Sequence, residues 1–153
     1  MPIWKFLHIA AMFGAVSVFV GQGLLSAGIA GTGDVRAIRR ALAAEARFQP
    51  AGGVLFVLGI LFGFVTAVTA GFDLTAAWLL TAYGLVIVVF ATGIGYHGPR
   101  GRKLEALAKA SPENEPSEAL RSLIDAPSAR VVAAFDSLLW LALIYVMVVK
   151  PFA

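Results

Sequence analysis

Four long apolar stretches constrain this chain more than any other feature of its sequence. They cover about residues 3–30, 52–70, 74–96 and 129–149. A helix of roughly 20 mostly apolar residues is what a hydrocarbon core of about 30 Å requires. The first stretch is much longer than the apolar core of a cleaved signal peptide, so we expect it to remain as a helix. The sequence therefore predicts an all-α membrane protein with four transmembrane helices.

The composition agrees with lipid as the surrounding solvent. Hydrophobic residues make up 59% of the chain and charged residues only 14%, against about 25% charged residues in soluble domains. The net charge of +3 could suggest nucleic acid, but the basic residues adjoin the apolar stretches instead of forming a basic domain. We therefore expect the lipid bilayer as partner and no nucleic acid. Cysteine is absent, which excludes disulfides, thiolate metal sites and cysteine nucleophiles.

The basic residues are distributed unevenly between the connections. All but two of the 12 lysines and arginines fall in or beside the connections at 31–51 and 97–128. The connection Gly71-Phe72-Asp73, between the second and third stretches, has none. Because positive loops stay in the cytoplasm, both basic connections should be cytoplasmic and both termini extracytoplasmic. The expected organisation is a single four-span domain over residues 1–153.

Small residues on the apolar stretches predict how the helices pack. Gly14, Gly21 and Gly28 recur every seven residues and so share one face of the first helix. Gly59 and Gly63 lie on one face of the second helix. Membrane helices associate through close contact at such residues, because lipid is as apolar as leucine. We therefore expect an antiparallel four-helix transmembrane bundle that can form a homo-oligomer through its glycine faces.

The first basic connection contains a helical signal. Asp34 can cap a helix whose apolar stripe includes Val35, Ile38, Leu42 and Ala46. This segment is either an amphipathic helix in the plane of the membrane or an extension of the second transmembrane helix. Pro50 marks the join between the two.

The second basic connection contains weaker signals. Gly98-Pro99 is expected to end the third helix. Short helices are predicted over 102–110 and 117–124, with a proline-containing loop over 111–116 between them. Pro127 then opens the fourth helix, since proline is tolerated in a first turn.

Polar side chains inside the apolar stretches are the best indicators of function. Asp136 lies about 10 Å along the fourth helix, where an unpaired carboxylate is costly. Its functional interpretations are a proton relay, an ion site or a substrate contact. The structural alternative is a pairing with Arg130, His97 or a tyrosine hydroxyl. His97 ends the third helix at a similar depth, so a Tyr96–His97–Asp136 cluster is compatible with the sequence, although His97 could also simply face water.

His8 lies one turn inside the first helix and shares a stripe with Gln22 and Ser26. It can ligate haem or a metal, carry protons, or serve as hydrogen-bonded packing. His8 and His97 should lie near opposite membrane faces, so one haem iron cannot bind both. Motifs of soluble enzymes are absent, so the sequence predicts no catalytic residue, no metal site and no obligatory cofactor.

Four segments resemble a known family. They are Trp4-Lys5-Phe6-Leu7-His8-Ile9, the stretch over 31–40, Trp78-Leu79-Leu80-Thr81-Ala82-Tyr83 and Met147-Val148-Val149-Lys150-Pro151. Their order is similar to that in bacterial predicted integral membrane proteins classed as domain of unknown function 2269. The resemblance implies a multi-span protein of the bacterial inner membrane, without an established activity.

The opening Lys5-Phe6-Leu7-His8-Ile9 is also similar to the first helices of HemJ-type protoporphyrinogen oxidases and copper-resistance CopD proteins. In the HemJ group the matching histidine binds haem, which implies an axial ligand at His8 and carries over to no other residue. Three functions stay open: a non-enzymatic membrane protein of unassigned function, a haem-binding membrane oxidoreductase using His8, and a proton-coupled small transporter using Asp136.

Overall fold

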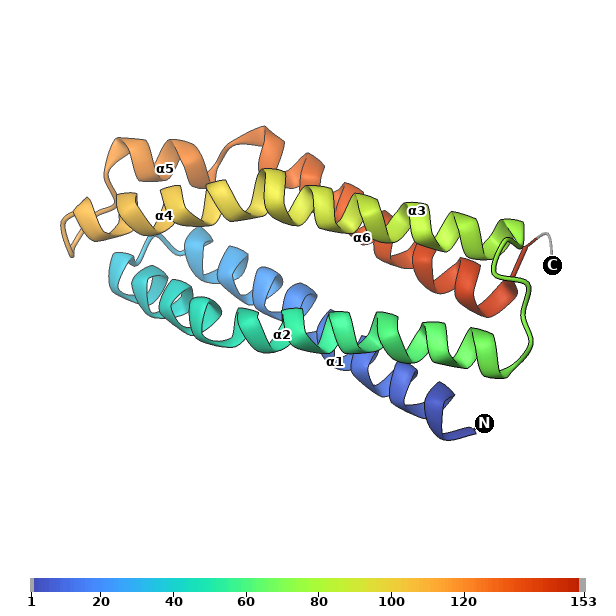
Figure 1. Cartoon of the computed structure of the whole chain (residues 1–153). Helices are drawn as coiled ribbons and strands as arrows, with labels where there is room; N and C mark the ends of the chain where they lie inside the picture. Colours follow the sequence, from blue (N-terminus) through green and yellow to red (C-terminus); the bar gives the residue numbers. More distant parts are fainter. Residues whose placement is uncertain (1, 152–153) are drawn as a thin grey trace. The chain divides into compact units, whose positions relative to one another are not determined.

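The computed structural model describes residues 2–151, which form helices and connecting turns but no strand. The elements are α1 (Pro2–Gly31), α2 (Val35–Thr69), α3 (Ala77–Thr92), the π-helix η1 (Gly93–His97), α4 (Gly98–Ala110), α5 (Glu118–Ile124) and α6 (Pro127–Val149) (Figure 1). Within residues 2–151, four helical stretches are long and apolar enough to cross a membrane: Pro2–Gly31, Val35–Thr69, Ala77–Ala110 and Glu118–Val149. The predicted all-α class is therefore confirmed.

The chain divides into two compact units. The first contains α1, α2 and the segment Ala108–Ser117. The second contains α3, η1, α4 as far as Leu107, α5 and α6. Each unit has its own contacts and is described by itself.

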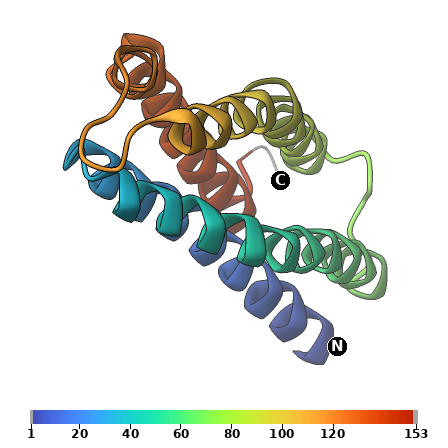
Figure 2. The ribbon, with the colours of Figure 1, turned by 90° about the vertical axis from the view of Figure 1, so that its left-hand side faces the viewer.

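In the first unit, α1 and α2 lie side by side in opposite directions, as the blue and teal helices of Figures 1 and 2 show. His8, near the start of α1, lies against Gly63, near the end of α2. Ser26, near the end of α1, donates a hydrogen bond of 2.9 Å to the Glu45 carboxylate, near the start of α2. Residues near the start of α1 therefore contact residues near the end of α2, and residues near the end of α1 contact residues near the start of α2. The two helices form an antiparallel pair.

Glycines of α2 let the two helices approach closely. A Cβ atom at Gly59 would lie 2.5 Å from Met12 Sδ. A Cβ atom at Gly52 would lie 2.8 Å from Val18 Cγ1 and 3.1 Å from Val18 Cβ. Real Cβ atoms do not come this near, so the α1 side chains occupy space that only glycine leaves open.

The predicted glycine face of α1 makes fewer contacts. A Cβ atom at Gly14 would lie 3.0 Å from a terminal methyl group of Leu55. At Gly21 and Gly28 a Cβ atom would meet no atom within 4 Å. In this unit the close helix contact therefore depends on α2 more than on the seven-residue repeat of α1.

The start of α2 confirms the predicted cap at Asp34. Its Oδ1 atom accepts hydrogen bonds from the backbone N–H groups of Arg36 at 2.9 Å and Ala37 at 3.1 Å. The helix then continues through Pro50 to Thr69. The segment before Pro50 is thus an extension of the second apolar helix, not a separate helix. Its 35 residues span about 52 Å, so α2 is longer than a hydrocarbon core of about 30 Å.

Arg39 holds the segment Ala108–Ser117 to α2. Its guanidinium group donates hydrogen bonds of 2.8, 3.2 and 2.7 Å to the backbone carbonyls of Ala108, Lys109 and Ser111. A helix end leaves such carbonyls without partners, so Arg39 caps the end of α4. Arg36 adds an exposed ion pair with Glu113 at 2.8 Å.

In the second unit, α3 continues through η1 into α4, without the end that the sequence predicts at Gly98-Pro99 (Figure 1). Proline has no N–H group, and in an α-helix its ring clashes with a carbonyl one turn earlier. In η1 the backbone widens, and the Gly98 N–H group donates to the Gly93 carbonyl, five residues back. The wider π turn makes room for Pro99, and the helix proceeds to Ala110.

Antiparallel packing of α3 and α6 forms the core of the second unit. The Lys150 ammonium lies 5.2 Å from the centre of the Trp78 ring, which joins the end of α6 to the start of α3. At the other end of α3 the contact is made by His97 and Asp136. The buried apolar side chains of this unit include Trp78, Leu79, Leu139, Leu143 and Val146.

Candidate functional site

His97 and Asp136 form a close pair in the second unit. The distance between His97 Nε2 and Asp136 Oδ2 is 2.6 Å. The side chains of His97 and Asp136 are 45% and 21% exposed, respectively, so both are only partly buried. The structure thus provides one of the partners that the sequence offered for Asp136, and it brings the two residues together from η1 and α6.

The pair lies at one end of the apolar stretch of α3. His97 is about 30 Å along the helix from Ala77, which is close to the thickness of a hydrocarbon core. Asp136 is about 13 Å along α6 from Pro127. Asp136 thus lies beyond the polar first turns of α6, beside His97. A carboxylate among apolar residues is costly unless it has a hydrogen-bonding partner.

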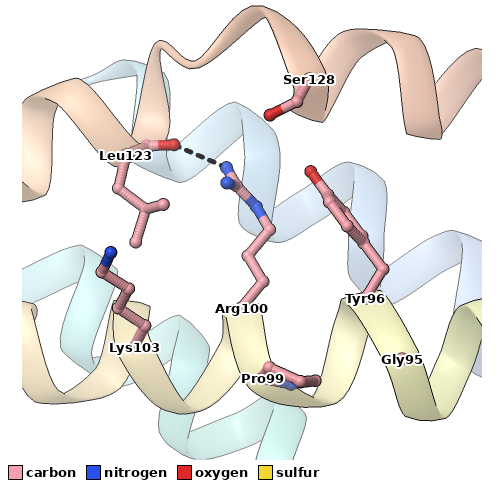
Figure 3. Close-up of a pocket in the computed structure, with 7 residues that line it drawn as sticks. All are labelled: Gly95, Tyr96, Pro99, Arg100, Lys103, Leu123 and Ser128. Carbon is pink, nitrogen blue, oxygen red and sulfur yellow. Dashed lines mark hydrogen bonds between the residues drawn. The ribbon is translucent and has the colours of Figure 1, made fainter.

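Tyr96 contacts His97 but does not join the hydrogen bond. The two rings pack edge to face, with centres 5.3 Å apart and planes at 89°. The hydroxyl oxygen of Tyr96 is buried, and it has no hydrogen-bond partner among residues 2–151. Figure 3 shows this hydroxyl turned toward Arg100 and Ser128. The predicted three-residue cluster is therefore a pair, His97 with Asp136, beside a separate site at Tyr96.

A pocket of about 300 Å³ lies at this second site (Figure 3). Tyr96 from η1, Arg100 and Lys103 from α4, Leu123 from α5 and Ser128 from α6 line it. Arg100 Nη2 donates a hydrogen bond of 2.7 Å to the Leu123 carbonyl. The guanidinium carbon of Arg100 lies 6.0 Å from the centre of the Tyr96 ring. The pocket therefore places two cationic groups and two hydroxyls around one space.

Sequence reasoning treated Arg100 and Lys103 only as loop charges. Tyr96, Arg100 and Lys103 follow one another at intervals of four and three residues, a spacing that places them on one face of a continuous helix. The expected helix end at Gly98-Pro99 assigned Tyr96 and Arg100 to different elements. The spacing of these three residues could have indicated a shared helix face. It does so only because the helix continues through η1 and past Pro99.

His8 is part of the packing in the first unit. Its Nδ1 atom lies 2.7 Å from the Gly59 carbonyl oxygen. A carbonyl only accepts, so Nδ1 carries the proton and Nε2 is the atom that could bind a metal. A Cβ atom at Gly63 would lie 2.8 Å from His8 Nδ1, so the ring fills the space that this glycine leaves. His8 could supply one axial ligand to a haem through Nε2.

A multidentate metal site is not visible in the part of the chain that the structure describes. Among residues 2–151, no group of three or more His, Cys, Asp or Glu side chains is placed to hold a metal ion. Gln22, a polar residue predicted to share a stripe with His8, is half-buried on α1. It belongs to the first unit, whereas Asp136 and His97 belong to the second.

No family model, curated protein or solved structure matches this chain. The candidate sites rest on the structure alone. They are the His97–Asp136 pair, the basic pocket beside Tyr96 and the His8 ring against α2. His97 of the pair and Tyr96, Arg100 and Lys103 of the pocket lie within ten residues of each other on one continuous helix, Ala77–Ala110.

Proposed function

We propose that this chain is a multi-pass protein of the bacterial inner membrane, with its four apolar helices arranged as an antiparallel transmembrane bundle. Each candidate span contains a stretch of 18 residues whose mean hydropathy is between 1.8 and 2.4. Large apolar side chains stand exposed along them, including Phe13 at 73%, Leu24 at 71%, Ile94 at 75% and Val148 at 75%. Water solvates such a surface poorly, whereas lipid solvates it well. These features support the bilayer as the solvent of the helices.

Within this membrane protein we propose proton exchange at His97 and Asp136, as the coupling site of a small carrier. The observation that carries the proposal is the 2.6 Å contact between His97 Nε2 and Asp136 Oδ2, which joins two candidate membrane helices. Histidine and carboxylate side chains are the usual components of proton relays within membranes. Partial exposure of both side chains supports access for protons.

Protonation of this pair would change how strongly η1 is held to α6. With a charged His97 and an ionised Asp136, a charge-assisted hydrogen bond connects the two helices. Removing the charge from either partner leaves only one charged group in the hydrogen bond, and the attraction between opposite charges is lost. π-Helical turns occur frequently at functional sites, and η1 places such a turn at the point where the contact is made. Proton binding could thereby be coupled to a shift between the helices.

The test is proton uptake by proteoliposomes loaded with a bacterial metabolite extract and a pH-sensitive dye. An imposed proton gradient should drive acidification in wild-type vesicles. Asp136→Asn keeps the size of the side chain and removes its charge, so acidification should fall to the level of protein-free vesicles. Asp125→Asn, at an exposed carboxylate of the same unit, is the matched control and should retain wild-type uptake. Wild-type uptake in Asp136→Asn would overturn the proposal.

Haem binding at His8 is a second candidate, and the hydrogen bond from Nδ1 to the Gly59 carbonyl favours it. Metal-ligating histidines generally donate their other ring N–H group to such a carbonyl, which orients the ligand. A bound haem would supply one-electron chemistry to the membrane protein. Protein purified from haem-replete cells should then show a Soret band that His8→Ala abolishes and His97→Ala retains. A colourless wild-type preparation contradicts this candidate.

A further inference from the structure

The pocket beside Tyr96 is lined by groups that suit an anion. Its charged and polar side chains are the Arg100 guanidinium, the Lys103 ammonium and the hydroxyls of Tyr96 and Ser128. Each of these can donate a hydrogen bond. None of the described residues that line the pocket is acidic. The space therefore has a positive charge without a protein counter-ion in its lining.

Several of these donors have no protein acceptor. The Tyr96 hydroxyl oxygen is buried and unpaired within the described chain. Buried polar side-chain atoms nearly always have a partner, so this one calls for an acceptor from outside. Lys103 and Ser128 are exposed and make no hydrogen bond or ion pair with any of residues 2–151, so a ligand can bind them in place of water. The pocket therefore contains one buried hydroxyl that lacks a partner and two exposed donors that a ligand can reach.

Arg100 is held in place for such a ligand. The bond from its Nη2 atom to the Leu123 carbonyl, 2.7 Å long, uses only part of the donor capacity of a guanidinium group. In Figure 3 the guanidinium is directed toward the Leu123 carbonyl, and the Tyr96 and Ser128 hydroxyls lie on its other side. A fixed guanidinium matches the oxygen geometry of a phosphate group, because two of its N–H groups can bond two oxygens.

We propose that this pocket binds a phosphate group, carried either by an anionic lipid or by a small soluble phosphate ester. Its volume of about 300 Å³ is sufficient for a headgroup of this size. Tyr96 lies about 28 Å along the apolar helix from Ala77, so the pocket is at the depth of lipid phosphates when α3 crosses a bilayer. Basic pockets between membrane helices at the cytoplasmic side bind anionic headgroups in this way.

The experiment uses the full chain and separates the two sources of phosphate. In one arm, native mass spectrometry measures phosphatidylglycerol retained by protein released from mixed phosphatidylcholine–phosphatidylglycerol nanodiscs. In the other arm, calorimetry measures the binding of inorganic phosphate and glycerol 3-phosphate to protein in pure phosphatidylcholine nanodiscs. Saturable binding in the first arm identifies a lipid site, and saturable binding in the second identifies a site for a soluble ester. Absence of saturable binding in both arms overturns the proposal.

Variants distinguish this pocket from diffuse attraction by surface charge. Lys103→Gln should weaken binding about tenfold, the effect of losing one charge-assisted hydrogen bond. Lys103 makes no protein hydrogen bond, so this change should leave the helix content seen by circular dichroism unaltered. Arg102→Gln removes the same charge from a neighbouring position outside the pocket lining and should leave binding unchanged. Equal losses in the two variants refute a defined site.

The phosphate site is independent of the proposed proton exchange. Asp136 is not among the residues that line the pocket, so Asp136→Asn should bind phosphatidylglycerol or phosphate as the wild-type chain does. Failure of proton uptake with intact phosphate binding would therefore remove only the carrier function.

Discussion

At the residue scale, Asp73 illustrates how neighbouring donors set the charge of one side chain. In the connection between α2 and α3, Asp73 Oδ1 accepts a hydrogen bond of 2.6 Å from the Thr75 hydroxyl and one of 2.8 Å from the Thr75 N–H group. These bonds, the side-chain bond first and the backbone bond second, lower the pKa of Asp73 below its usual value of 3.8. The ionised carboxylate therefore stabilises the fold above pH 3.8, and this contribution is lost as the pH falls through the lowered pKa.

Thr75→Val should raise the pKa of Asp73 toward 3.8, because it removes the hydroxyl donor and keeps the backbone donor. A titration of the Asp73 carboxyl carbon by NMR measures the change. Thr75→Ser retains the hydroxyl and should keep the wild-type pKa. Identical titration curves in Thr75→Val and the wild type would show that the hydroxyl bond does not hold the carboxylate in its charged form.

At the element scale, the glycines of α2 decide how closely α1 can approach. Gly52 lies against Val18, whose branched side chain has little freedom to rotate in a helix. Gly59 lies against Sδ and Cγ of Met12, whose unbranched side chain changes its conformation more easily than that of Val18. The same type of residue thus carries different structural weight, according to the stiffness of what faces it.

Gly52→Ala should destabilise the α1–α2 pair by about 1–3 kcal/mol, because the new methyl group overlaps Val18. Gly21→Ala, which meets no atom within 4 Å, should be neutral or slightly stabilising, since alanine favours a helix more than glycine does. Thermal unfolding in detergent, followed by circular dichroism, compares the two variants. A loss in Gly21→Ala as large as that in Gly52→Ala would contradict the role given to the Val18 contact.

At the scale of the whole molecule, charge distribution sets the expected orientation in the membrane. The extended start of α2 carries Arg36, Arg39, Arg40 and Arg47, and the end of the Ala77–Ala110 helix carries Arg100, Arg102, Lys103 and Lys109. The connection between α2 and α3 contains no basic residue. We expect the two basic regions in the cytoplasm and this connection outside, by the positive-inside rule. Association of two or more copies of the chain through their glycine faces stays a prediction.

Single cysteines test this orientation directly, because the chain has none of its own. A membrane-impermeant maleimide applied to intact spheroplasts should label Thr75→Cys and leave Asn114→Cys unlabelled until the membrane is broken. Both positions are exposed in connections, so access of the reagent to the side chain is comparable. Labelling of Asn114→Cys in intact spheroplasts would invert the predicted topology.

Much of the fold could be predicted because its signals are local. The apolar stretches, the cap at Asp34 and the loop after Ala110 depend on residues that are close in the sequence. Helix ends at prolines could not be predicted in the same way. Pro50 and Pro99 both lie in continuous helical stretches, because α1 contacts α2 on both sides of the first, and a π turn makes room for the second.

The sequence by itself determined that this chain is helical, that it has four stretches able to cross a membrane, and that Asp136 needs a partner. Only the tertiary structure decided that the partner is His97 and that Tyr96 faces a basic pocket instead. Helix formation and hydropathy depend on residues that are close together in the sequence, so both can be predicted from the order of the amino acids. Pairing between distant residues depends on helix rotation and register, and several partners, such as Arg130, would have met the same chemical need.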